Sequence, residues 1–61
     1  MSNSILEYVN LKIYYSNLVS LYQRLTNKGE LSPIEAGSLR VCLDLLNEKI
    51  KAKEEELKVV Q

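Results

Sequence analysis

The chain of 61 residues contains no histidine or tryptophan and only one cysteine, Cys42. A lone thiol cannot form an internal disulfide, and without histidine no ordinary zinc site can be assembled. A serine or cysteine nucleophile would also lack a histidine to serve as its general base. From these absences we expect no catalytic residues, no metal ion, no cofactor and no small-molecule substrate, so the chain is predicted not to be an enzyme.

Neither sign of charge prevails, because eight basic residues are balanced by eight acidic ones. There is therefore no overall field to draw the chain to nucleic acid or to an anionic membrane. No apolar run approaches the roughly 20 residues of a membrane span, and the beginning MSNSILEYVN lacks the features of a signal peptide. We expect a soluble, cytoplasmic protein without a membrane partner.

Backbone-breaking residues gather only in NKGELSPIE, residues 27–35. Gly29 suits the left-handed residue that ends a helix. Ser32 and Glu35 have the spacing of a capping box, in which each side chain accepts a hydrogen bond from the other residue's backbone N–H. Pro33 then falls at the first helical position, where its missing N–H costs nothing. This stretch predicts a turn between two helices.

The whole chain is predicted to be one all-α domain, an antiparallel two-helix hairpin with its turn at 28–32. The first helix is expected at about 5–27, since Ser4 and Glu7 have the spacing of a second capping box. The second helix is expected at about 33–59. The two segments match in length, so they can pair along their whole extent.

Each predicted helix carries a heptad seam, with apolar residues spaced alternately three and four apart. Tyrosine and leucine alternate in the first helix, and one lysine, Lys53, interrupts the second. Residues that build a helix stripe of this kind are interpreted as core packing rather than as a ligand site. The seam residues are Tyr8, Leu11, Tyr15, Leu18, Tyr22, Leu25, Ala36, Leu39, Leu43, Leu46, Ile50 and Leu57.

The seam leads to two expectations about single side chains. Antiparallel pairing brings Tyr8 near Lys53, whose stem would cover the ring while its ammonium group stays in water. Cys42 lies in an apolar run and is interpreted as a small buried hydrophobic residue, with a redox or intermolecular disulfide role as the alternative.

Apolar residues remain after the seam is paired, and they form a second stripe on each helix. A helix that is apolar most of the way round is normally buried on more than one side. We therefore expect a homodimer in which two hairpins form a four-helix bundle. The predicted function is that of a non-enzymatic protein-interaction module, an adaptor, assembly factor or modulator of a larger protein. The oligomer or partner interface is predicted at Leu6, Val9, Ile13, Val41 and Leu45.

A small nucleic-acid-binding regulator is the first alternative. A bundle of hairpins can bind RNA or DNA across one face, an architecture that resembles the plasmid copy-number regulator that holds paired RNA loops. The cations available for phosphate contacts are Lys12, Arg24, Lys28 and Arg40.

The second alternative comes from the stretch LRVCLD, which begins at Leu39. It resembles the sporulation aspartyl-phosphate phosphatases, small helical hairpins with a Ser-Gln-x-Leu-Asp motif in their second helix. Leu43 and Asp44 match the end of that motif, whereas Arg40 and Val41 stand where the family has Ser and Gln. The resemblance would imply a phosphatase role for Asp44.

Overall fold

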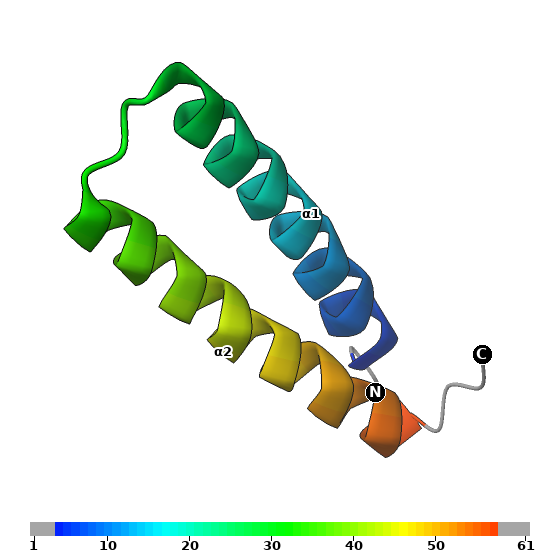
Figure 1. The fold of residues 1–61 in the computed structure, drawn as a ribbon. Helices are drawn as coiled ribbons and strands as arrows, with labels where there is room; N and C mark the ends of the chain where they lie inside the picture. Colours follow the sequence, from blue (N-terminus) through cyan, green and yellow to red (C-terminus); the bar gives the residue numbers. More distant parts are fainter. Residues whose placement is uncertain (1–3, 58–61) are drawn as a thin grey trace.

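The computed structural model describes residues 4–57, which form two α-helices packed against each other. Helix α1 spans Ser4–Lys28 and helix α2 spans Pro33–Leu57. They lie side by side and antiparallel, so the start of α1 is next to the end of α2 (Figure 1). The predicted all-α helical hairpin is confirmed. The predicted end of the second helix at residue 59 lies outside the described residues.

The end of α1 is closed by a glycine in the left-handed conformation. Gly29 has a φ of 69° and its backbone N–H donates to the carbonyl of Thr26 at 3.0 Å. The next N–H, that of Glu30, donates to the carbonyl of Leu25 at 3.0 Å. This pair of bonds is a Schellman motif, which satisfies carbonyls that the end of the helix leaves without a partner. The role predicted for Gly29 is therefore confirmed.

The start of α2 has the predicted capping box. The backbone N–H of Ser32 donates to Oε1 of Glu35 at 3.0 Å, and the N–H of Glu35 donates to Oγ of Ser32 at 3.2 Å. Pro33 is the first residue of the helix, as predicted. Two orphan N–H groups are thereby satisfied by neighbours three residues away, so this helix start depends only on local sequence.

Acidification is expected to weaken this helix start. The pKa of the Glu35 carboxyl lies below its ordinary value of 4.5, first because the Ser32 N–H donates to it and second because of the Ser32 side chain. A lowered folded-state pKa means that the stabilisation is present above about pH 4.5 and is lost as the pH falls through the folded-state pKa. Circular dichroism should therefore show helix content falling as the pH drops below about 4.5.

The variant Glu35→Gln isolates this effect, because glutamine accepts the same hydrogen bond but does not titrate. We expect the variant to lose less helix than the native chain over the same acid range. The pKa of Glu56 is also lowered, but that residue titrates in both proteins and cancels in the comparison. Equal acid losses in the two proteins would contradict the prediction.

The core between the helices is thin. All twelve residues of the predicted seam are buried or half-buried, and Ile50 is 7% exposed. Within residues 4–57, Ile50 is the only residue classed as buried. Two helices touch along one line and cannot surround a side chain, so most seam residues keep part of their surface in water.

Candidate functional site

An open apolar groove of about 600 Å³ lies on one face of the hairpin. Most of it belongs to α2, and Leu18 of α1 closes one side. Cys42, Leu45, Leu46 and Ala52 share a face of α2 because residues three, four or seven positions apart lie close together on a helix. We call this the α2 groove. Its full lining is Leu18, Cys42, Leu45, Leu46, Glu48, Lys49 and Ala52.

The expectation that Cys42 is buried is wrong, since its side chain is an exposed free thiol. The apolar run around it is real, but successive helical residues diverge by about 100°. Leu43 lies on the seam and is half-buried, while Cys42, one position earlier, is turned out of the seam into the α2 groove. The direction of the side chain, rather than the hydrophobicity of the run, decides its burial.

A second hollow, of about 370 Å³, adjoins the α2 groove. The two share Lys49, so they lie on the same face of the hairpin. This hollow contains Tyr14, which is 55% exposed although it carries a large aromatic ring. Tyr14 is in neither the predicted seam nor the predicted interface. Tyr14 follows Glu7 by seven residues, so both lie on the same face of α1, and both line this hollow. This spacing is the sequence signal that could have identified Tyr14.

The predicted interface residues do not all line one groove. Val9 and Ile13 line a hollow of about 390 Å³ that belongs entirely to α1, which we call the α1 groove. Leu45, by contrast, is 58% exposed and lines the α2 groove. Leu6 and Val41 are exposed outside both grooves. The full lining of the α1 groove is Tyr8, Val9, Lys12, Ile13, Ser16 and Asn17.

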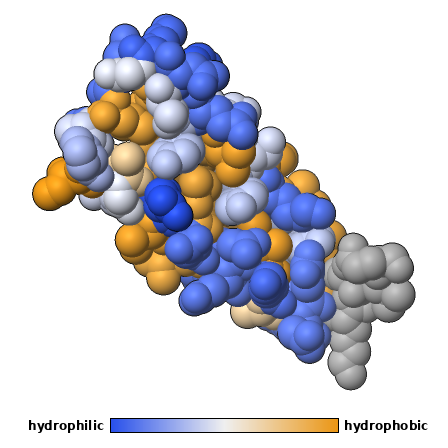
Figure 2. Space-filling model, in the orientation of Figure 1, coloured by the Kyte–Doolittle hydropathy of each residue, from blue (hydrophilic) through white to orange (hydrophobic). Residues whose placement is uncertain are grey.

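Hydrophobic residues also reach the surface in the space-filling view. They lie along the body of the hairpin, interspersed with hydrophilic residues, and also protrude at the turn end on the left of the view (Figure 2). Apolar surface of this extent on a small protein is a mark of an interaction site.

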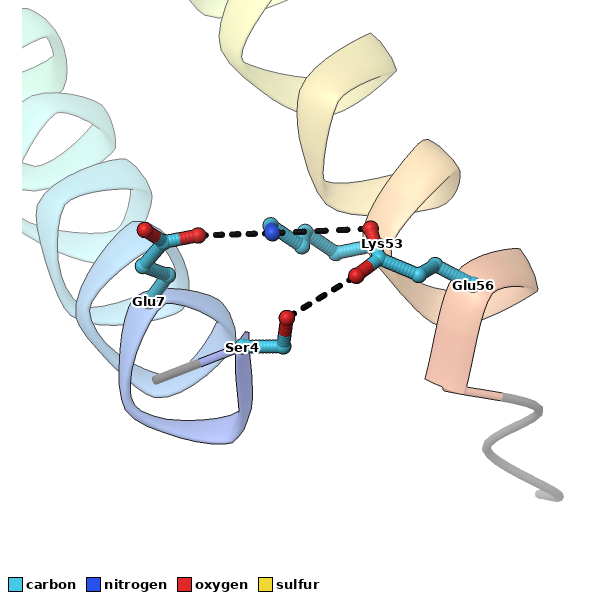
Figure 3. A network of polar contacts seen from close by, with 4 residues as sticks. All are labelled: Ser4, Glu7, Lys53 and Glu56. Atoms are coloured by element: carbon cyan, nitrogen blue, oxygen red, sulfur yellow. Dashed lines mark hydrogen bonds and ion pairs between the residues drawn. The ribbon is translucent and has the colours of Figure 1, made fainter. Parts of the chain in front are cut away.

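A polar network closes the open end of the hairpin (Figure 3). Nζ of Lys53 lies 2.6 Å from Oε1 of Glu7 and 3.5 Å from Oε1 of Glu56. The hydroxyl of Ser4 donates to Oε2 of Glu56 at 2.8 Å. Ser4 and Glu7, whose spacing predicts a capping box, are thus directed across the hairpin to α2.

The network shifts two pKa values. The hydrogen bond with Glu7 raises the pKa of Lys53 above its ordinary value of 10.5, against the opposing effect of desolvation. The hydrogen bond from Ser4, followed by the charge of Lys53, lowers the pKa of Glu56. Both groups stay charged at neutral pH. Exposed pairs of this kind contribute little stability, so we assign the network to helix register rather than to chemistry.

Tyr8 has partners other than the predicted lysine. Its hydroxyl donates to Oε2 of Glu54 at 2.9 Å, and the ammonium group of Lys12 lies 5.2 Å from the centre of its ring. The ammonium group of Lys53 contacts Glu7, and the expected cover of the Tyr8 ring by the Lys53 stem stays a prediction. Lys12 takes the place over the ring as a cation–π partner from the same helix.

The four cations of the nucleic-acid alternative are all exposed. Lys12 lies over the Tyr8 ring, and Lys28 is the last residue of α1. Their heptad positions place Lys12 and Arg40 on one side of the seam and Arg24 and Lys28 on the other. The hairpin therefore does not gather them into one basic patch. Asp44 is also exposed, on α2.

Among residues 4–57, no group of three histidine, cysteine or acidic side chains is placed to hold a metal ion. Neither helix in the described part of the chain is long and apolar enough to cross a membrane. No family model matches the chain, and comparisons with curated proteins and with solved structures give no match either.

Proposed function

We propose that this chain is a non-enzymatic protein-interaction module that self-associates as a dimer of hairpins. The observation that carries the proposal is the ratio of exposed to buried apolar residues. Ile50 alone is buried within the described helices, while eight large hydrophobic residues are between 44% and 79% exposed. These are Ile5, Leu6, Val9, Ile13, Tyr14, Ile34, Val41 and Leu45.

The physical reason is that a single hairpin cannot cover this surface. Fully burying one large aliphatic or aromatic side chain contributes about 1.5–3 kcal/mol. Domains below about 70 residues rarely obtain enough stability from their own core and commonly gain it by oligomerisation. One cysteine cannot form an internal disulfide, and without histidine no ordinary zinc site is expected to take that role.

The two grooves give the proposal a mechanism. Each presents apolar residues at helical spacing, which is the form in which a helix of another chain docks by its i, i+3, i+4 and i+7 residues. A second copy would cover one groove and leave the other for a larger protein. The chain would then act as an adaptor, an assembly factor or a modulator.

Sedimentation equilibrium at micromolar concentration tests the proposal. We expect a mass of twice the chain's 7.0 kDa. Leu45→Glu disturbs the α2 groove and Ile13→Glu disturbs the α1 groove, and at least one of them should return the mass to that of a monomer. Gln23→Glu adds the same charge at an exposed position outside both grooves and should leave the mass unchanged. A well-folded monomeric native chain would overturn the proposal.

The same preparations distinguish the alternatives. Binding to RNA or DNA that weakens steeply with salt would report counterion release and favour a nucleic-acid regulator. Hydrolysis of an aspartyl phosphate that disappears in Asp44→Asn would favour the phosphatase resemblance. Capture of one protein that is insensitive to salt, and is lost in Ile13→Glu or Val41→Glu, is the result expected for the proposed module.

A further inference from the structure

We infer that the α2 groove is the self-association site, and that the second copy fills it with Tyr14. In this arrangement α1 of each hairpin lies over α2 of the other. The two-fold axis that relates the copies lies between them and is parallel to the long axis of each hairpin. The inference rests on the proposed self-association and specifies which surface it uses.

The groove and the residue that fills it are on the same face. The hollow that contains Tyr14 and the α2 groove are both lined by Lys49, so they adjoin each other. A second copy that covers the groove therefore also approaches Tyr14. Tyr14 is 55% exposed and Leu45, within the groove, is 58% exposed. An exposed aromatic ring beside an open apolar groove is a complementary pair for an isologous interface, in which the same patch of both copies meets.

The register of the hairpin brings the ring to the middle of the groove. Glu7 lies opposite Lys53, so Tyr14, seven residues further along α1, is about level with Leu46, seven residues back along α2. A two-fold along the long axis exchanges the helices and preserves their levels. Tyr14 of the second copy therefore reaches the groove between Leu45 and Lys49, near its centre.

The charges agree with the same arrangement. Lys28 and Tyr14 lie fourteen residues apart, and Glu35 and Cys42 lie seven apart, so both charged residues belong to the face that carries the groove. The two-fold brings Lys28 over α2 of the second copy within about 4.5 Å, three residues along the helix, of the level of Glu35. Opposite charges thus meet at the turn end of both copies, whereas the same count brings Glu7 near the level of Glu56 at the open end, so the support from charge is confined to the turn end.

The other face-to-face arrangement is less favourable. A two-fold axis that is perpendicular to the long axis and parallel to the broad face of the hairpin would place α2 antiparallel on α2 of the second copy. Glu35 of one copy would then approach Glu56 of the other, while Lys28 would approach Glu7, so the charges alone do not decide between the two arrangements. Tyr14 would lie over α1 of the second copy, and the α2 groove would receive no aromatic ring.

The available area is that of a stable dimer. The hairpin measures 43 × 22 × 15 Å, so its broad face covers roughly 900 Å². Stable interfaces take about 800 Å² from each partner. One face of the hairpin is therefore large enough for the dimer and leaves the opposite face free.

The test mixes two variants that are each expected to dissociate. Tyr14→Lys and Leu45→Glu should each raise the dimer dissociation constant at least about tenfold, because each places a charge in an apolar contact. An equimolar mixture should form dimers again. In the mixed dimer the introduced lysine meets the introduced glutamate on one side, while the native Tyr14–Leu45 contact survives on the other.

The matched control is a mixture of Ile13→Lys with Leu45→Glu. It supplies the same two charges, but Ile13 lines the α1 groove and would not face Leu45. Ile13→Lys should therefore dimerise by itself, while the Leu45→Glu chains in the mixture should stay monomeric. Sedimentation gives the mass of each sample, and circular dichroism reports helix content if a dissociated variant unfolds. Recovery in the first mixture alone supports the inference.

Two outcomes would overturn the inference without touching the proposed function. In the first, the native chain is a dimer but the mixture of Tyr14→Lys and Leu45→Glu stays dissociated. In the second, either variant alone remains a native-strength dimer. A monomeric native chain would instead remove the proposed self-association and the inference with it.

Discussion

Replacing Ile50 with alanine is expected to lower the free energy of unfolding by about 2–5 kcal/mol. Ile50 is 7% exposed and is the one buried residue of the described hairpin. Alanine removes apolar atoms from the most buried side chain of the described hairpin, and two stiff helices cannot close the space that is left. Urea unfolding followed by circular dichroism measures the loss.

The loss at Ile50 is a large fraction of the whole because the free energy of unfolding of so short a chain is small. Stability of about 0.05–0.15 kcal/mol per residue corresponds to roughly 3–9 kcal/mol for a chain of this length. The substitution therefore removes a large fraction of it, and the urea midpoint of Ile50→Ala should lie well below that of the native chain.

Ile34 provides the matched control, since it is the same residue type in the same helix and is 79% exposed. Ile34→Ala should change the free energy of unfolding by no more than about 0.5 kcal/mol, and alanine's higher helix propensity could make the change favourable. Similar losses at the two positions would show that the burial of Ile50 does not carry the stability of the hairpin.

The melting temperature is expected to rise with protein concentration. A second copy that binds the folded hairpin and not the unfolded chain stabilises the fold by mass action. At a concentration of about one hundred times the dissociation constant, this contribution is about 2.7 kcal/mol, which is comparable to the loss expected at Ile50. Thermal melts over about a hundredfold range of concentration measure it.

Leu45→Glu is the control for this second prediction, because it is expected to melt as a monomer. Its melting temperature should be lower than that of the native chain and independent of concentration. A native melting temperature that stays constant over the whole range would contradict the prediction, since a dimer that folds as it associates must lose stability on dilution.

The turn of the hairpin was predictable from the sequence residue by residue. Gly29 ends α1 and the Ser32–Glu35 capping box begins α2, as the spacing of these residues predicts. Such motifs act through hydrogen bonds between residues a few positions apart, so local sequence contains all that they need. The seam residues also lie on the half-buried or buried side, because heptad spacing puts them on one face of each helix.

The candidate site was predictable only in part. Leu45 is a predicted interface residue that lines the α2 groove, but Cys42 was expected to be buried and Tyr14 was not singled out. Both neighbour a seam residue, and a shift of one position turns a helical side chain by about 100°. Hydrophobicity averaged over a run does not resolve that difference.

By itself, the sequence determined two helices, their turn and the faces that meet, because each depends on helical periodicity or on contacts between near neighbours. Only the tertiary structure decided that Ser4 and Glu7 bind residues of α2 instead of capping their own helix. It also decided that Val9 and Ile13 line one groove and Leu45 another, while Leu6 and Val41 lie outside both. Those outcomes depend on how two helices are rotated about their own axes when they pack, and that rotation is set by contacts between residues far apart in the chain.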